Sequence, residues 1–385
     1  MLAVKCTKQS HRCYELNDLM IEFRFMVNEA IRVGIEKNIT SKFTLRNEVY
    51  YKFKNQFHTS YIAMAVFRAH ALLKSYRKSL KKKPDTRIPR VKLAKMFLVV
   101  DSYVYKIIHN HIQIPTRPHE FVIIPLNHHV VKAISDPSLK LGNATLTAST
   151  LSISFTKKIE EQKPSGYIGI DMNLDNMTCC DEQGKIRVFD TSYLTKMKQT
   201  YREIKSHFKR DDVRIRKKIF TKYGIIQQNK ENQFLHRITK KIASENKTVF
   251  MEELKGIRKL YRKGNGQGKK FRFKLNSWAR YKAQSQIEYK SLWNGNNVYF
   301  VNPRGTSAKC SICDGKIIEE NRMVRCPQCG LHIDRDVNAS RNILNRGLLM
   351  HPHGARFEPD APQVEAMKQS KDAEQIVASL TVGNR

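Results

Sequence analysis

The sequence predicts a mixed α/β domain that contains a four-cysteine metal-binding unit and follows a β-rich domain with inserted helices. Three observations support this. After Gly166, short apolar segments alternate with long, charged helical segments, as in mixed α/β sheets. Residues 310–329 contain two Cys-x-x-Cys pairs. The residues before Lys163 combine strand-like alternation with two helical patterns.

The N-terminal domain is predicted to be a β-barrel with a helical insertion at about residues 14–95. Apolar residues recur at helical spacing from Leu16 to Ile35 and from Ser60 to Leu80. The segments around the insertion favour strands because their apolar residues alternate or form short runs. The expected strands are Phe97–Val100, Tyr103–Ile108, Gln113–Ile114, Phe121–Ile124, Ala144–Ala148 and Leu151–Phe155.

The boundary of the first domain is expected near Lys163, where the composition changes at Lys163-Pro164-Ser165-Gly166. The α/β domain then spans residues 164–305 and 333–349, interrupted by the cysteine unit at 306–332. Residues 350–385 are polar and poor in aromatic residues, so a disordered tail is predicted.

The strongest compositional signal is charge: 70 Lys and Arg oppose 35 Asp and Glu, a formal net charge of +35. A small soluble domain usually carries a net charge of magnitude about 2–8. Such an excess favours a polyanionic partner, because Lys and Arg that contact phosphates release counterions. The composition therefore predicts nucleic-acid binding. A ribosomal-type protein or a generally basic surface is the alternative, and acidic membranes are disfavoured.

Nothing in the sequence favours a membrane or secreted protein. No segment approaches the roughly 20 consecutive apolar residues of a membrane-spanning helix, and the basic stretch Met1–His11 lacks the apolar core of a signal peptide. A cytoplasmic location is the simplest expectation. In that compartment the paired cysteines favour metal binding over disulfides.

Three acidic residues stand where apolar segments end or a helix begins. Asp171 ends the apolar run Tyr167–Ile170, and Glu252 ends the run Thr248–Met251. Asp336 opens a helical segment. Carboxylates suit Mg²⁺ or Mn²⁺, and two such cations about 3.5–4 Å apart promote hydrolysis of a phosphodiester. We therefore predict that these three acids bind catalytic metal. A single acid at a strand end would more often be a cap or a solvated terminus.

The cysteine pairs predict a structural zinc site formed by Cys310, Cys313, Cys326 and Cys329. Each Cys-x-x-Cys pair forms a tight turn that directs both sulfurs to one metal, and twelve residues between the pairs suffice for a hairpin. Four protein ligands leave no open coordination position, so this zinc would have no direct chemical role.

Together these segments resemble the TnpB family of transposon-associated RNA-guided nucleases, which is related to compact type V CRISPR effectors. The resemblance lies in Gly169-Ile170-Asp171, in Val249–Leu254, in both cysteine pairs with their neighbours, and in Asp334–Ala339. It is specific from about Gly166 to Leu344. Two positions depart from the family pattern, because Asn173 and Asp314 stand where glycine is usual.

The resemblance implies an RNase H-like (RuvC) nuclease domain with an inserted zinc ribbon, preceded by a wedge barrel that carries a helical recognition lobe. It implies a metal-dependent endodeoxyribonuclease with Asp171, Glu252 and Asp336 as its catalytic residues. It also implies a noncoding guide RNA and a target DNA recognised beside a short adjacent motif. The basic run after the second helix is a hypothesis for contacts with RNA or heteroduplex backbone: Lys81, Lys82, Lys83, Arg87 and Arg90. A solvated basic linker is the alternative.

Other functions remain open at this point. An RNA-guided DNA-binding repressor would be expected to lack one of the three acids. A DNA transposase or resolvase could use the same fold without RNA, although the inserted zinc unit argues against a simple resolvase. A zinc-ribbon RNA-binding protein without catalysis would leave the two acids at strand ends unexplained.

Overall fold

The computed structural model describes residues 2–92, 97–117, 119–160, 163–208, 212–254, 256–257, 264 and 266–350. The chain divides into two compact units, one of Leu2–Lys158 and one that begins at Ile159. This division lies a few residues before Lys163, where the sequence places the domain boundary. The predicted tail, apart from its first residue, falls outside the described residues.

The strands of the N-terminal unit form two antiparallel sheets, one ordered β1-β7-β6-β2 and one ordered β3-β4-β5. Gln9 links them, because its Nε2 donates to Pro125 O (2.7 Å) and its Oε1 accepts from Asn127 N (2.9 Å). A closed barrel remains a prediction. The elements are β1 (Leu2–Ser10), β2 (Leu98–Val100), β3 (Lys106–Ile108), β4 (His111–Arg117), β5 (Glu120–Pro125), α4 (His128–Ile134), β6 (Leu139–Leu146) and β7 (Thr150–Lys158).

Three helices lie between β1 and β2 in sequence: α1 (Leu16–Glu36), α2 (Lys42–Phe53) and α3 (Thr59–Leu80). The sequence pattern predicts α1 and α3 but misses α2. Only Leu45, Val49 and Phe53 are buried on α2, too few to give a clear helical period. None of the described helices is long and apolar enough to cross a membrane.

Two predicted boundaries in this unit are wrong. The helical insertion ends at Leu80, not near residue 95, because Pro84 and Pro89 interrupt the chain that follows. The strand expected from Tyr103 begins only at Lys106. The residues before it turn around Asp101, whose carboxylate accepts hydrogen bonds from Ser60 Oγ (2.6 Å) and Tyr103 Oη (3.0 Å).

The second unit is built on a five-stranded sheet ordered β10-β9-β8-β11-β12. β8 pairs antiparallel with β9, and β9 with β10, whereas β11 pairs parallel with both β8 and β12. The elements are β8 (Tyr167–Met172), β9 (Asn176–Asp181), β10 (Ile186–Asp190), α5 (Ser192–Ser206), α6 (Val213–Ala243), β11 (Thr248–Glu252), α7 (Lys269–Ser277), α8 (Arg280–Trp293) and β12 (Val298–Val301).

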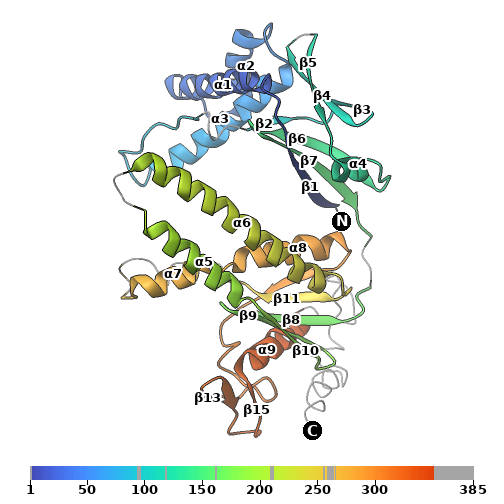
Figure 1. Ribbon diagram of the computed structural model, residues 1–385, viewed down its shortest axis with the longest axis vertical. Coiled ribbons are helices and arrows are strands. Elements are labelled where there is room, and N and C mark those ends of the chain that lie inside the picture. The colour runs from blue at the N-terminus through green and yellow to red at the C-terminus, as the bar shows by residue number, and fades with distance from the viewer. Residues whose placement is uncertain are drawn as a thin grey trace. The chain divides into compact units, whose positions relative to one another are not determined.

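Helices cover both faces of this sheet (Figure 1). On one face, Ile168, Ile170 and Met251 pack with residues of α5, α6 and α8. On the other face, Phe250 packs with Ile343 and Leu344 of α9 (Arg335–Met350). Because successive side chains of a strand alternate between faces, each residue of β8 and β11 is assigned to one layer.

A small three-stranded antiparallel sheet precedes α9 in sequence. It consists of β13 (Ile318–Glu320), β14 (Met323–Arg325) and β15 (His332–Asp334). Its core is small: Val324, Leu331 and Ile333 pack with Cys310 and Cys326. Because β15 ends at Asp334 and α9 begins at Arg335, this sheet and the helix are directly joined.

Helix α9 approaches β8 closely at Gly169. A Cβ atom at Gly169 would lie 2.4 Å from Ser340 O and 2.7 Å from Leu344 N, both backbone atoms of α9. The helix would therefore have to move as a body to admit any side chain. The closeness of the two backbones explains a glycine in the middle of a buried strand.

We predict that Gly169→Ala lowers the free energy of unfolding by about 1–3 kcal/mol, the usual cost of overpacking a dense core. Chemical denaturation would measure it. Gly224→Ala is the control, because Gly224 lies on α6 and a methyl group there would meet open space. That substitution should leave stability unchanged or raise it by up to about 1 kcal/mol. Equal effects of the two would contradict the assigned contact.

Candidate functional site

Asp171 and Glu252 lie side by side on the face of the sheet that α9 covers. Strand β11 runs parallel to β8 with Met251 opposite Ile170, so the next residue of each strand is an acid. Gly169 and Phe250 both face α9, and the acids follow each of them by two positions. The period of two therefore places both carboxylates on the same face.

Asp336 reaches this place from α9. It occupies the first turn of the helix and is buried, at 3% exposure. The backbone N–H of Asp336 donates to Asp334 Oδ1 (2.8 Å). Asp334 therefore caps the helix and does not join the carboxylate cluster of Asp171, Glu252 and Asp336. Three acids from distant parts of the sequence thus converge at one end of the sheet.

The pKa of Asp171 reflects this convergence. Burial, followed by the negative charges of Glu252 and Asp336, raises it to about 7, although a hydrogen bond from Asn173 opposes the rise. Burial likewise raises the pKa of Glu252. Carboxylates gathered in a buried place need a compensating cation, so the donor set fits Mg²⁺ or Mn²⁺.

Three polar side chains hold one carboxylate each. Asn173 Nδ2 donates to Asp171 Oδ2 (2.7 Å), Thr306 Oγ1 to Glu252 Oε1 (2.5 Å), and Asn176 Nδ2 to Asp336 Oδ2 (2.9 Å). Asn173 Nδ2 also donates to Asn176 Oδ1 (3.3 Å), which connects the first and third acids. The carboxylate orientations are therefore fixed by the protein itself.

Arginines compensate part of the charge. Arg322 Nη2 lies 2.5 Å from Asp336 Oδ2, and Arg335 Nε lies 3.6 Å from Asp336 Oδ1. Arg322 follows β13 in the small sheet, and its side chain is 65% exposed. The small sheet thus supplies a cation to the carboxylate cluster. Sequence analysis missed Arg322 and Asn176, because neither lies in a motif that marks contact with an acid.

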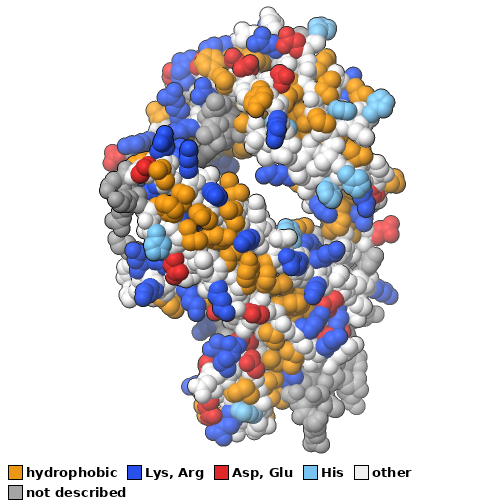
Figure 2. Space-filling model, in the orientation of Figure 1, with side chains coloured by type: hydrophobic (Ala, Val, Ile, Leu, Met, Phe, Trp, Pro, Cys, Tyr) orange, Lys and Arg blue, Asp and Glu red, His pale blue; other side chains and the backbone are white. Residues whose placement is uncertain are grey.

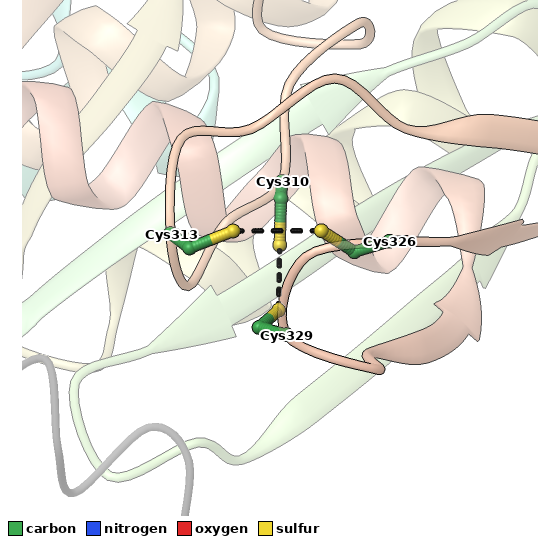
Figure 3. A group of neighbouring side chains, drawn as sticks. All are labelled: Cys310, Cys313, Cys326 and Cys329. Atoms are coloured by element: carbon green, nitrogen blue, oxygen red, sulfur yellow. Dashed lines mark hydrogen bonds between the residues drawn. The ribbon is translucent and has the colours of Figure 1, made fainter.

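The four cysteines predicted as zinc ligands form a compact group. Their sulfur atoms all lie within 4.8 Å of one another, with Cys310 and Cys329 3.5 Å apart and Cys313 and Cys326 3.4 Å apart (Figure 3). These separations are too long for disulfides. In the described part of the chain no other group of three or more His, Cys, Asp or Glu residues is this tight. The carboxylates of Asp171, Glu252 and Asp336 are therefore spaced more widely than the four sulfur atoms.

The geometry fits one tetrahedral zinc ion. A Zn–S length of about 2.3 Å corresponds to sulfur separations of about 3.8 Å. Backbone N–H groups led by that of Cys329 lower the pKa of Cys326 to about 6, whereas burial raises the pKa of Cys329 to about 12. Neighbouring thiolates repel one another, so full ionisation of the group needs a bound cation.

The cysteine unit is tied to α9 by asparagines spaced along one side of the helix. Asn338 Oδ1 accepts from Ser311 N (2.9 Å), and Asn342 and Asn345 donate to the carbonyls of Lys309 (2.7 Å) and Ser311 (3.0 Å). The first cysteine turn is thus fastened to the helix that carries Asp336. The cysteine unit and Asp336 are therefore connected through one helix.

The two departures from the family pattern now have structural accounts. Asp314 adopts a φ of 58°, in the left-handed region that glycine occupies without strain, and its carboxylate pairs with Lys309. Asn173 instead uses its side chain, which holds Asp171. Both substitutions add polar contacts that glycine does not provide.

The basic run of the N-terminal unit follows α3. All five hypothesised contact residues, Lys81, Lys82, Lys83, Arg87 and Arg90, are exposed. None of the five forms an ion pair with another described residue. Their ammonium and guanidinium groups are therefore accessible to a polyanion, although this does not separate a binding surface from a solvated linker.

Two family models match parts of the chain. Residues 281–343 match the Cas12f1-like TNB domain, and residues 19–115 match a family described as uncharacterized protein MJ0013. The first match includes α8 apart from its first residue, the cysteine unit and Asp336. It covers the segment where the sequence motifs are most specific.

TnpB-like protein MJ0751 of Methanocaldococcus jannaschii is 30% identical over 257 residues, which cover 61% of this chain and 90% of that protein. The chain belongs to the TnpB family. A relative from Streptomyces pristinaespiralis, named a putative RNA-guided DNA endonuclease, is 34% identical over 130 residues. That alignment covers 33% of this chain and 31% of the relative. The resemblance inferred from the motifs is therefore confirmed.

A solved structure shows the fold of this TnpB-family chain. The cryo-EM structure of a Cas12f1–sgRNA–target DNA complex aligns with a TM-score of 0.54 at 14% identity. The alignment covers 86% of this chain and 82% of the Cas12f1 chain. The likeness therefore extends over both units and is a likeness of fold.

We predict that the protein contains about one zinc ion per chain and that Cys326→Ser removes it. Loss of zinc should also lower the melting temperature of the cysteine unit, because a structural zinc contributes on the order of 10 kcal/mol to so small a core. Elemental analysis and thermal unfolding would measure both. Cys6→Ser, which changes an exposed thiol of the other unit, is the control and should retain the metal. Full zinc content in Cys326→Ser would refute the site.

Proposed function

We propose that this protein is an RNA-guided DNA endonuclease with a single RuvC-type cleavage site. The observation that carries the proposal is the convergence of Asp171, Glu252 and Asp336 on the face of the sheet under α9. The strand order, with antiparallel β10, β9 and β8 followed by parallel β11 and β12, agrees with the RNase H-like fold that the family resemblance implies. Relatives named RNA-guided DNA endonucleases support the same function.

The three carboxylates would hold two Mg²⁺ or Mn²⁺ ions. When bound, such ions activate water and stabilise the leaving oxygen of a phosphodiester. The protein's contribution is orientation. Asn173, Thr306 and Asn176 keep the carboxylate oxygens in fixed directions, so little reorganisation is needed when substrate arrives.

The charge of the chain supports binding of nucleic acid. A formal net charge of +35 suits a protein that holds the backbones of an RNA and a DNA strand together. Sequence specificity would then come from base pairing between guide and target, while the protein reads a short adjacent motif. We assign that reading to the N-terminal unit, with its sheets as the wedge and α1, α2 and α3 as the recognition lobe.

The first experiment expresses the protein with its native flanking DNA and sequences the RNA that copurifies. The complex is then incubated with Mg²⁺ and a plasmid library with randomised sequence beside the target. We expect cuts beside one short motif. Asp171→Ala should reduce cutting by roughly a thousandfold, since metal ligation is worth several kcal/mol.

Asp175→Ala is the matched control. Asp175 lies in the turn between β8 and β9, is 44% exposed and pairs with Lys274, so its loss should leave cutting nearly unchanged. Target binding without cutting by the unsubstituted protein would favour a repressor. Cutting that needs no RNA would favour a transposase or resolvase.

We further propose that Lys81, Lys82, Lys83, Arg87 and Arg90 contact the RNA or heteroduplex backbone. Replacing all five by Gln should weaken binding of the copurifying RNA and reduce the slope of log affinity against log salt by about 0.7 for each lost contact. Filter binding at several salt concentrations would measure this. The control replaces five exposed lysines elsewhere in the same unit: Lys5, Lys8, Lys106, Lys132 and Lys140. An unchanged slope in the test variant would leave the run as a solvated linker.

A further inference from the structure

A cavity of about 450 Å³ lies between α5, α6 and α7 of the second unit. Its volume is within the range of small-ligand sites, about 300–1,000 Å³. Cations, aromatic rings and amides line it together. The proposed cleavage mechanism makes no use of this cavity.

A buried ion pair forms part of the cavity wall. Lys198 Nζ lies 3.0 Å from Glu231 Oε2 and donates to Ser277 O (2.7 Å), so it joins α5 to α6 and α7. Lys282 adds a second cation 3.5 Å from Glu231. The charge of Glu231 is therefore already compensated, and this part of the wall is structural.

Two other cations of the cavity have no acidic partner among the described residues. The Arg202 guanidinium lies over the ring of Phe273, 4.1 Å from its centroid. Lys205 Nζ lies 5.7 Å from the centroid of Phe220. Each cation is thus held beside an aromatic ring and keeps its charge available for an anion.

One aromatic ring of this cavity, that of Phe220, reaches solvent. The Phe220 side chain is 43% exposed, and the cations of Lys205 and Arg216 lie beside its ring. Figure 2 shows hydrophobic side chains lying beside Lys and Arg side chains over this helix pair. An exposed aromatic ring beside cations is the pattern that binds stacked bases and phosphates of a single strand.

The remaining polar groups suit the edge of a base. Gln227 lines the cavity, and its amide has no hydrogen-bond partner among the described residues. An amide both donates and accepts, as do the edges of nucleobases. A simple carboxylate ligand would use the cations but leave the rings and this amide without a role.

A second, narrower cavity adjoins this one. Ser277 borders both this cavity and a narrower one that is lined by Met172 and Asn173, next to Asp171. Met172 packs with α5, α6 and α8, on the face of the sheet opposite to Asp171, so a strand bound in the cavity would not occupy the proposed cleavage site.

We propose that this cavity binds one nucleotide of a single-stranded nucleic acid, with the base stacked on the Arg202–Phe273 pair or Phe220 and the phosphate at Lys205. The proposal rests on the proposed function, which brings single strands to this unit. The bound nucleotide belongs either to the DNA strand that is cut or to the guide RNA. Both present the same chemistry.

The test uses the full chain carrying Asp171→Ala, so that bound DNA stays intact. Two affinities are measured: that of the RNA-loaded complex for labelled oligo-dT of about 12 nucleotides, and that of RNA-free protein for the copurifying RNA. Arg202→Ala and Phe273→Ala should each weaken one of them by roughly tenfold, the loss expected when a stacked base is released. Halogenated pyrimidines in that strand should crosslink to Phe220 or Phe273.

Matched controls lie on the same helices outside the cavity: Lys196→Ala on α5 and Phe271→Ala on α7, both exposed. Weaker oligo-dT binding alone assigns the site to the DNA strand, and weaker RNA binding alone assigns it to the guide. If neither affinity changes, or if the controls change as much, the proposal is wrong. Absence of RNA-directed cutting by the unsubstituted protein would instead reject the proposed function, and these binding results would still stand.

Discussion

The close contact of α9 with β8 is the constraint on which the second unit depends. Gly169 has no side chain, so the backbone of α9 can approach the strand at Ser340 and Leu344. Gly347 similarly makes room for the ring of Phe250. These two contacts fix the helix over the strand ends where Asp171 and Glu252 lie. The first turn of α9 can then bring Asp336 to the same place.

The same helix connects two sites of different chemistry. Asparagines of α9 bind the first cysteine turn, and Thr306, just before that turn, donates to Glu252. Arg322 of the small sheet pairs with Asp336. A structural zinc would therefore act at a distance from the carboxylates by keeping their neighbours in place.

Electrostatic balance differs between the parts of the molecule. The carboxylate cluster of Asp171, Glu252 and Asp336 is buried and concentrates negative charge. Burial and the two neighbouring charges raise the pKa of Asp171 to about 7. The chain as a whole nevertheless carries an excess of 35 positive charges. A polyanion is thus attracted to the protein as a whole, while cations are required at one point within it. Both requirements are met when metal ions and nucleic acid bind together.

The sequence by itself determined the features that depend on spacing along the chain. The Cys-x-x-Cys pairs, the helices of residues 16–36 and 59–80, and the acids after apolar runs all follow from local periodicity. The resemblance to the TnpB family rested on these motifs. Only the tertiary structure decided which side chains meet. Asn176 and Arg322 reach Asp336 from positions 160 and 14 residues away, and the cavity of Arg202 and Phe273 joins helices far apart in sequence. Such contacts depend on how the layers pack, and packing leaves no periodic signal in the chain.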